Sequence, residues 1–302
     1  MKSGLISQGG AGVYMANSIK IKEGKTYLVT GGSGFLGSPL VKRILDQGGK
    51  ARVMARGEGK LILLKEEHPQ IEIYPGDVSD PFEVRQAMVG ITGVFHLAAS
   101  KHVGLAEKFV RENIKTNTIG SLNILESSLS EKPEFVVGIS TDKAAQVSGV
   151  YGATKLLMER LFAQYEGLNK QTQYRIVRYG NVLYSTGSVL CKWKRLIQEG
   201  KEVTITDRTA TRFFWTVEQA VNLIFQCLQQ ACDSKPFCPD MKSMSMGDLL
   251  EAMVLKYSFG QEIPIKIIGL QKGENLHEKV LDEGPNSSES EKFTVKEIMR
   301  LI

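Results

Sequence analysis

Cysteine is scarce in this chain, and its few cysteines are not spaced for metal binding. The 302 residues contain Cys191, Cys227, Cys232 and Cys238, and no others. No two of them form a C-x-x-C pair, and no histidine stands at zinc-ligand spacing, so we expect no metal site. A few unpaired thiols are typical of a reducing compartment, which favours reduced cysteines and a cytoplasmic location.

Long apolar runs and blocks of one charge are also missing. No stretch approaches the ~18 consecutive apolar residues of a membrane helix, so we expect no membrane span. The N-terminus lacks the compact apolar segment of a secretory signal. Lys and Arg total 38 against 33 Asp and Glu, and the net charge of +5 is spread along the chain. This mild basicity suits a phosphate-bearing small ligand as well as nucleic acid, and does not decide between them.

Proline is low at 9 residues, whereas glycine is high at 30. This balance indicates close backbone approaches rather than proline-rich linkers. From Lys25 onward, short β-like runs alternate with segments of helical spacing, notably Ala106–Ser130 and Gly152–Tyr165. The strand-like runs are Lys25–Thr30, Ala51–Ala55, Ile71–Tyr74, Gly93–Leu97, Phe135–Ser140 and Arg175–Tyr179. The alternation predicts an α/β fold, a doubly wound parallel sheet with helices on both faces.

The pattern also suggests a division of the chain. Residues 1–24 have no clear period and are interpreted as a flexible leader, with Met15 a candidate start. Residues 25–180 carry the alternation and are expected to form a Rossmann dinucleotide-binding domain. Residues 181–302 are expected to form mainly a smaller, interleaved substrate-binding domain, with segments that return to the first domain.

A glycine-rich turn, Thr30–Gly37, joins the first strand to the first helix. Glycines in such a turn let backbone N–H groups approach a pyrophosphate at the positive end of the helix. A bare turn without a ligand is the alternative, but it would not need glycine at positions 31, 34 and 37 together. We therefore expect a dinucleotide at Gly31, Ser33, Gly34, Phe35, Leu36 and Gly37.

Residues after the next strands indicate which dinucleotide binds. An acid after the second strand would bind the ribose of NAD, whereas Arg56 offers a cation to a 2′-phosphate, which favours NADP. The alternative is a solvated surface arginine. Asp77 follows the third strand and could accept from the adenine amino group, or it could cap the helix that begins near Pro81. The same cofactor site is expected to include Val78, Ala98 and Ala99.

Tyr151 and Lys155 stand one helical turn apart, so both project from one face of a helix after the fifth strand. A tyrosine has an ordinary pKa of about 10, and needs the Lys155 cation and an oxidised cofactor to act as a base near neutrality. The alternative is an ordinary amphipathic helix start.

Thr141, Asp142 and Lys143 lie at the carboxyl end of that strand, where parallel sheets bind ligands. Thr141 can hydrogen-bond a substrate hydroxyl, Asp142 can act as a general acid, and Lys143 can act as a general base if its pKa falls. We expect desolvation and nearby Lys101 to lower the pKa of Lys143 from about 10.4. The alternative is a helix cap and a surface ion pair.

Together these residues resemble the extended short-chain dehydrogenase/reductase family. Further segments resemble the UDP-N-acetylglucosamine 4,6-dehydratases in the same order, from about Lys25 to Val280. They are His96–Val103, Ser140–Ala145, Tyr151–Lys155, Arg178–Val182, Thr211–Phe213 and Gly273–Glu278. Lys143 stands where the retaining enzymes have glutamate, and so resembles the inverting branch.

The resemblance implies a hydro-lyase that uses NADP and a UDP-sugar. Tyr151 would take the proton of the sugar 4-hydroxyl while hydride leaves C4. Lys143 would remove the C5 proton as Asp142 protonates the departing 6-hydroxyl, and hydride would return to C6. The product would be a UDP-2-acetamido-2,6-dideoxy-L-arabino-hex-4-ulose for cell-surface sugar synthesis. A cytoplasmic homo-oligomer without nucleic acid or membrane partners is also implied.

The residues expected to bind the nucleotide depart from the family pattern. An arginine expected within Tyr184–Ser188 is absent, and Gln271 replaces another, so Lys272 is expected to supply charge. Asn181 and Arg212 are expected to contact the diphosphate, although Arg212 could instead form a structural ion pair. Lys101 and His102 are expected to line the sugar pocket. The run Phe213–Trp215 could stack on a base or belong to the core, and His96 is interpreted as a core histidine.

Two other functions stay open. A nucleotide-sugar 4-epimerase or reductase of the same family would keep the glycine turn, Tyr151 and Lys155, but would not need Asp142 and Lys143. A non-catalytic NADP-binding scaffold is the third hypothesis, although such proteins commonly lose the Tyr–Lys pair that this chain retains.

Overall fold

Seven parallel strands form the central sheet of the structure, a computed structural model that describes residues 19–271 and 273–302. Their order across the sheet is β10-β6-β5-β4-β1-β2-β3. The strands are β1 (Thr26–Thr30), β2 (Lys50–Ala55), β3 (Glu72–Pro75), β4 (Gly93–His96), β5 (Phe135–Thr141), β6 (Gln173–Tyr179) and β10 (Pro236–Phe237). The predicted parallel sheet is confirmed, and the six apolar runs coincide with β1 to β6.

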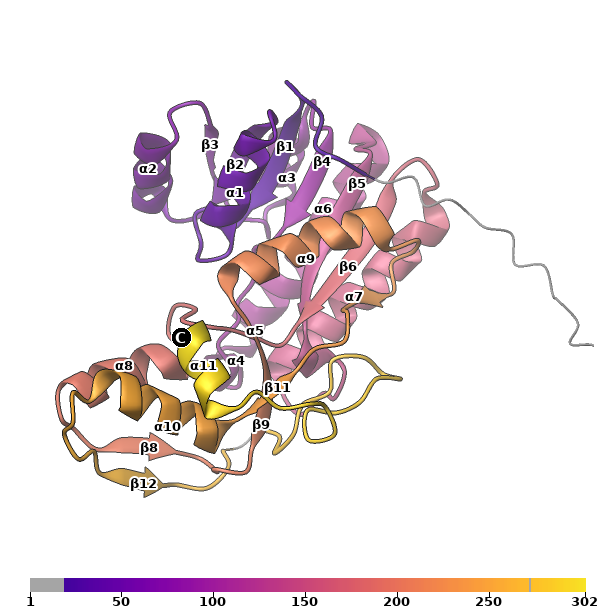
Figure 1. The fold of residues 1–302 in the computed structure, drawn as a ribbon. Coiled ribbons are helices and arrows are strands. Elements are labelled where there is room, and N and C mark those ends of the chain that lie inside the picture. The colour runs from indigo at the N-terminus through magenta and orange to yellow at the C-terminus, as the bar shows by residue number, and fades with distance from the viewer. Residues whose placement is uncertain (1–18, 272) are drawn as a thin grey trace, which may run out of the picture.

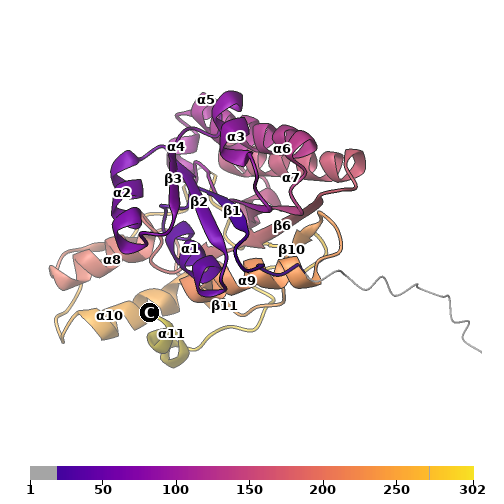
Figure 2. The ribbon, with the colours of Figure 1, turned by 90° about the horizontal axis from the view of Figure 1, so that it is seen from above.

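Helices cover both faces of this sheet, as a doubly wound fold requires (Figures 1 and 2). One face packs against α1 (Gly37–Asp46), α2 (Glu58–Glu67) and α9 (Val217–Gln230). The other packs against α3 (Pro81–Met88), α6 (Gly120–Glu131) and α7 (Val150–Leu168). Neighbouring strand residues Leu28 and Val29 belong to opposite core clusters, because side chains alternate between the faces of a strand.

The predicted helix over Ala106–Ser130 is correct in position but not continuous. It consists of α4 (Val103–Ala106), α5 (Val110–Asn113), the π-helical turn η1 (Ile114–Ile119) and α6. Within η1, the Asn117 side chain accepts from the Ser100 N–H at 2.7 Å and donates to the Thr154 hydroxyl at 3.0 Å. The turn thus joins the loop after β4 to α7.

A smaller region with its own core lies below the sheet in Figure 1. It contains the two-stranded sheet of β8 (Val203–Ile205) and β12 (Ile265–Ile267), and the three-stranded sheet of β7 (Asn181–Val182), β9 (Thr211–Trp215) and β11 (Ser243–Ser245). Its helices are α8 (Val189–Gln198), α10 (Met246–Tyr257) and α11 (Val295–Leu301). We propose that this region is the substrate-binding domain expected within residues 181–302, with α9 and β10 as the returning segments.

Most of the expected leader, residues 1–18, lies outside the described residues. At its described end Ile19 is buried, and its N–H donates to the Leu228 carbonyl at 3.3 Å. Within residues 19–271 and 273–302, no helix has both the length and the apolar character needed to cross a bilayer.

Gly37 at the start of α1 packs against the preceding turn without room for a side chain. A Cβ there would lie 2.4 Å from the Gly31 carbonyl oxygen and 2.5 Å from Gly32 Cα. Both are backbone atoms, so no side-chain rotation can relieve the clash. We therefore predict that Gly37→Ala lowers the free energy of unfolding by about 1–3 kcal/mol.

Gly59 in α2 is the matched control, because no heavy atom lies within 4 Å of its Cβ position. Gly59→Ala should raise the free energy of unfolding by up to about 1 kcal/mol, since alanine loses less chain entropy in a helix. Urea unfolding followed by circular dichroism measures both variants. A Gly37→Ala protein as stable as the wild type would contradict the close packing.

Candidate active site

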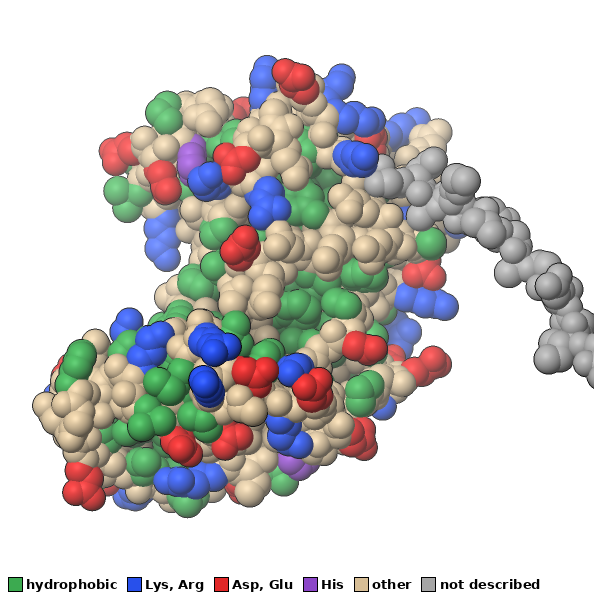
Figure 3. Space-filling model, in the orientation of Figure 1, with side chains coloured by type: hydrophobic (Ala, Val, Ile, Leu, Met, Phe, Trp, Pro, Cys, Tyr) green, Lys and Arg blue, Asp and Glu red, His purple; other side chains and the backbone are tan. Residues whose placement is uncertain are grey.

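A cavity of about 1410 Å³ lies at the carboxyl ends of the central strands, between the sheet and the smaller region. Figure 3 shows the hollow between these two parts of the surface. The sheet order reverses at β1, which pairs with β2 on one side and β4 on the other. Ligands of open α/β sheets bind at such a point, so the cavity is where the fold class predicts a site.

The structure brings the candidate site residues together in this cavity. All of the residues assigned to the cofactor or to catalysis line its wall, and Lys101, His102, Asn181 and Arg212 do so as well. Lys272 lies outside the described residues.

The glycine turn forms a cradle at one end of the cavity. Gly31 has φ 69°, and a Cβ on it would lie 2.9 Å from the Ala98 nitrogen. Leu36, the residue before α1, makes no side-chain cap, and the first turn of α1 has no acidic residue. At the start of α1 the Ser38 N–H donates to the Gly34 carbonyl at 3.0 Å, so the N–H groups left for an anion are those of the turn before the helix, which fits a dinucleotide pyrophosphate.

Arg56 and Asp77 face each other beside this cradle. Arg56 Nη1 lies 3.8 Å from Asp77 Oδ2, and the Arg56 side chain is 61% exposed. The hypothesis that Asp77 caps the helix after it is wrong, because Asp80 is the cap of α3 and accepts from the N–H groups of Phe82 and Glu83. Asp77 Oδ1 instead accepts from the Ser79 N–H at 2.9 Å.

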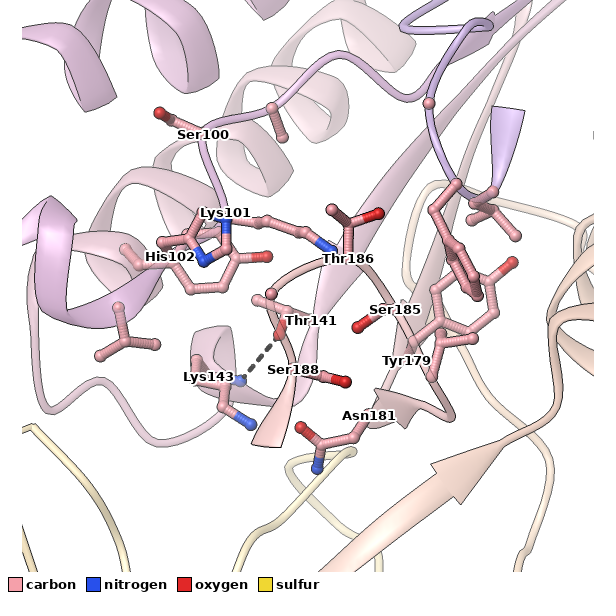
Figure 4. Close-up of a pocket in the computed structure, with 18 of the residues that line it drawn as sticks. Ser100, Lys101, His102, Thr141, Lys143, Tyr179, Asn181, Ser185, Thr186 and Ser188 are labelled. Carbon is pink, nitrogen blue, oxygen red and sulfur yellow. Dashed lines mark hydrogen bonds between the residues drawn. The ribbon is translucent and has the colours of Figure 1, made fainter. Parts of the chain in front are cut away.

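A charged cluster occupies the end of β5 and the short 3₁₀ turn η2 (Asp142–Ala144). The Thr141 hydroxyl donates to Asp142 Oδ1 at 2.8 Å, and Lys143 Nζ donates to Asp142 Oδ2 at 2.9 Å. Asp142 is 0% exposed, so the alternative of a surface ion pair is wrong. Figure 4 shows Thr141 and Lys143 side by side, with the Lys143 N–H donating to the Thr141 hydroxyl.

The expected fall in the Lys143 pKa is wrong for this structure. Burial lowers the pKa of Lys143, but the carboxylates of Asp142 and Glu278 together outweigh it, so its pKa lies above the ordinary value. Glu278 Oε1 lies 3.4 Å from Lys143 Nζ. The lysine is therefore held as a cation until one of its carboxylate partners changes.

Tyr151 and Lys155 occupy the first turns of α7, as predicted. Burial raises the pKa of Tyr151 to about 12, although the Thr141 hydroxyl and the Lys143 cation oppose this rise. Burial lowers the pKa of Lys155 to about 8, and Glu159 opposes the fall. Lys143 is the cation that lowers the pKa of Tyr151 in this structure, whereas Lys155 Nζ donates to Met158 Sδ at 3.0 Å.

The opposite wall faces the smaller region. In Figure 4 Lys101 extends toward Thr186, and His102 lies beside it. Burial lowers the pKa of Lys101. Asn181 Nδ2 donates to the Phe213 carbonyl at 3.4 Å.

Arg212 is already engaged within the protein. Its Nη2 lies 3.0 Å from Glu274 Oε1, and its Nε lies 3.6 Å from Glu278 Oε1. It also donates to the carbonyls of Thr211 and Leu276 at 2.9 Å each. These contacts favour the structural ion pair, on the wall of the cavity.

Glu278 is the residue that sequence reasoning missed. It is 2% exposed and lines the cavity between Lys143 and Arg212. The only signal was its place at the end of the segment Gly273–Glu278, because nothing in the local pattern locates its two cationic partners.

Other polar and aromatic candidates are structural. His96 is buried and bonds Thr30 at 2.8 Å and Ser121 at 2.9 Å, which confirms a satisfied core histidine. Phe213 and Phe214 are buried, as the core hypothesis predicts. The four cysteines are free. Within the part of the chain that the structure describes, no group of His, Cys, Asp and Glu is arranged to hold a metal ion.

Comparison with known proteins shows which family the chain belongs to. Residues 27–301 match the family model described as polysaccharide biosynthesis protein. An uncharacterised membrane protein of Methanocaldococcus jannaschii is 40% identical over 270 residues, which cover 86% of this chain and 81% of the relative. An inverting UDP-N-acetylglucosamine 4,6-dehydratase of Campylobacter jejuni is 36% identical over 84% of this chain and 76% of its own length.

Two further matches bear on activity and fold. A UDP-glucose 4-epimerase of Rickettsia canadensis is 33% identical over 85% of this chain and 77% of its own length. The solved structure of Pen from Bacillus thuringiensis is 30% identical, with a TM-score of 0.87 over 93% of this chain and 97% of that one. The relatives thus include both dehydratases and epimerases.

His96 provides a test of the buried network that joins β1, β4 and α6. Burial is the main cause that lowers its pKa from 6.5 to about 3, and the Lys155 cation adds to the effect. As the pH falls below 6.5, the unfolded chain binds a proton on this residue that the folded protein excludes. The folded state should then lose about 1.4 kcal/mol of stability per pH unit, down to about pH 3.

Urea unfolding of the wild type and of His96→Asn between about pH 5 and about pH 8 measures this contribution. The stability advantage of the wild type should be constant above the ordinary histidine pKa and shrink steadily below it. An advantage that does not change with pH would show that His96 takes up protons equally in both states.

Proposed function

The chain belongs to the polysaccharide biosynthesis protein family, among the nucleotide-sugar dehydratases and epimerases, and we propose that it is a UDP-N-acetylglucosamine 4,6-dehydratase that inverts C5. The observation that carries this proposal is the pair of buried Asp142 and partly buried Lys143 beside Tyr151 in one cavity. A 4-epimerase would need only the base at C4. An acid and a base at a second position are what elimination across C5 and C6 requires.

A nicotinamide dinucleotide fits the cradle at Gly31, Gly34 and Gly37, because the backbone packs there too closely for side chains and a turn of this kind lets a pyrophosphate approach the backbone N–H groups. When bound, it would supply the hydride acceptor for C4 and the hydride donor for C6. We propose NADP, since Arg56 lies on the cavity wall where a ribose 2′-phosphate would reach it.

Tyr151 takes the proton of the sugar 4-hydroxyl in the proposed reaction. Its pKa of about 12 already includes the lowering by the Thr141 hydroxyl and the Lys143 cation, so the phenolate needs the further positive charge that an oxidised nicotinamide would bring. The C4 ketone then acidifies the C5 proton, which Lys143 removes. Asp142 protonates the departing 6-hydroxyl, and water leaves.

The number of protons and the net charge are both conserved over the cycle. The reaction starts from a Tyr151 phenolate and a protonated Asp142, whereas the free protein holds this proton on Tyr151 and keeps Asp142 as a carboxylate, so the proton must pass from Tyr151 to Asp142 before hydride leaves C4. Tyr151 and Lys143 then each gain one proton from the sugar, while Asp142 gives one to water and one returns to C5. The protein therefore ends with the protons it began with. We assign the sugar side of the cavity to Lys101, His102 and Asn181. Arg212 is paired with Glu274 and Glu278, so a diphosphate contact by Arg212 or by Lys272 stays a prediction. The homo-oligomer, the cytoplasmic location and the role in cell-surface sugar synthesis stay predictions.

Incubation of the protein with UDP-N-acetylglucosamine and NADP in heavy water tests the proposed function. We expect a 4-keto-6-deoxy product with deuterium at C5 and the L-arabino configuration, identified by NMR. Lys143→Glu should lose most elimination while it keeps some oxidation at C4, and Tyr151→Phe should lose oxidation while it still binds the cofactor. A product that is only the C4 epimer, without loss of water, would identify an epimerase instead.

A second prediction concerns Arg56, which we propose selects NADP over NAD. Charge-assisted hydrogen bonds from one arginine to a phosphate contribute about 1.5–3 kcal/mol, so the wild type should bind NADP more tightly than NAD by roughly 10- to 100-fold. Arg56→Asp should reverse this order. Arg85→Asp on α3 carries the same change of charge on an exposed residue outside the cavity wall and should leave the order unchanged. Equal affinity of the wild type for both cofactors, measured by calorimetry, would refute the assignment.

A further inference from the structure

Glu278 is a buried carboxylate in the cavity wall to which the proposed reaction gives no role. Its Oε1 lies 3.4 Å from Lys143 Nζ and 3.6 Å from Arg212 Nε. Its Oε2 is buried and has no hydrogen-bond partner among the described residues. A buried carboxylate oxygen without a partner is costly, because desolvation is not repaid by a contact.

The backbone holds Glu278 in this place. Its N–H donates to the Ser287 hydroxyl at 2.8 Å, and its carbonyl accepts from the Ser287 N–H at 2.8 Å. The Ser287 hydroxyl also bonds Thr211 at the start of β9, next to Arg212. The carboxyl group is thus fixed relative to both of its cationic neighbours.

Several ionisable groups surround the pair of Lys143 and Glu278. Asp142 faces this pair from η2, Arg212 faces it from β9, and the Tyr151 hydroxyl faces it from α7. Glu274 pairs with the far side of Arg212, and Cys238 lies near Asp142. Two carboxylates, Asp142 and Glu278, therefore share the single ammonium group of Lys143.

The two carboxylates differ in how well their ionised forms are satisfied. Asp142 accepts one hydrogen bond on each oxygen, from Thr141 and from Lys143. Glu278 has one oxygen unpartnered, and burial raises its pKa while Lys143 and Arg212 oppose the rise. A proton taken from Lys143 is therefore held more readily by Glu278 than by Asp142.

We propose that Glu278 is a catalytic residue that receives the proton Lys143 must lose before it can act as the C5 base, an inference that rests on the proposed function. The proton moves from Lys143 Nζ to the Glu278 carboxylate, so a cation and an anion become a neutral amine and a neutral acid. Lys143 then takes the C5 proton. Reprotonation of C5 draws one proton from the pair, which ends with the number it began with.

A substrate bound in the cavity favours this transfer, because it displaces water from the pair. The exclusion of water makes two separated charges more costly, whereas the neutral amine and acid lose little on desolvation. Because the active and resting forms hold the same number of protons, the fraction of neutral Lys143 does not depend on the pH of the solvent.

Glu278→Gln tests the proposal, because glutamine keeps the shape of the side chain but cannot take the proton. Lys143 must then lose its proton to solvent. We expect C4 oxidation within about twofold of wild type, seen as reduced nicotinamide that accumulates, and elimination about 100-fold slower near neutrality. Elimination by the variant should rise about tenfold per pH unit between about pH 6.5 and about pH 8.5, while that of the wild type stays flat.

Two further variants control the result. Glu278→Asp keeps an acceptor and should restore the flat pH profile with part of the rate. Glu283→Gln makes the same change at an exposed carboxylate five residues further along the chain and should behave as wild type. Circular dichroism and cofactor binding show whether each variant is folded.

The outcomes separate the two proposals. If wild type forms no 4-keto product, the proposed function fails and the role of Glu278 fails with it. If wild type forms product and Glu278→Gln keeps a flat profile, Asp142 alone accepts the proton and the Glu278 proposal is refuted. Elimination faster than wild type would refute it too, because it would mean that Glu278 serves only to hold Lys143 charged.

Discussion

Buried Asp142, Arg212 and Glu278 and partly buried Lys143 form one charged cluster at the cavity wall, and they must stay in contact because an isolated buried charge costs several kcal/mol. Asp142 and Lys143 follow β5, Arg212 lies in β9, and Glu278 lies in the segment after β12. These segments belong to the sheet and to the smaller region, so charge neutrality fixes how the two parts meet. Arg178, buried in β6, adds a second link by donating to the Val280 carbonyl at 2.8 Å. The cavity between the parts takes its position from these contacts.

The same burial leaves the free protein without a strong base near neutrality. Tyr151 has a pKa of about 12, and the pKa of Lys143 lies above its ordinary value. Both groups hold their protons until a ligand changes their surroundings. A positive charge near Tyr151 stabilises its phenolate, and the exclusion of water destabilises the ion pairs of Lys143. Reaction is therefore coupled to binding, which protects reactive sugar intermediates from an open site.

The sequence predicts those features that depend on local pattern. β1 to β6 are visible because strands buried on both faces give short apolar runs, and the turn before Gly37 is visible because only glycine fits there. The direction in which the pKa of Lys143 is shifted cannot be predicted from the local sequence, because it depends on Glu278, which is 135 residues away in the chain. The choice between Asp77 and Asp80 as the cap of α3 also depends on where the helix begins. The π-helical turn at Asn117 has no periodic signature, because the apolar spacing on either side of it stays helical.

The buried cluster is better explained by chemistry than by stability. Ion pairs removed from water contribute little to folding, and apolar side chains of similar size stabilise a protein at least as well. An epimerase gains nothing from such a cluster, because its reaction needs proton transfer only at the C4 oxygen. Elimination needs a base at C5 and an acid at the C6 oxygen, and both must be shielded from water until substrate arrives. In the proposed reaction, Asp142 and Lys143 are these two groups, and Glu278 holds the proton that separates the resting form of Lys143 from its active form.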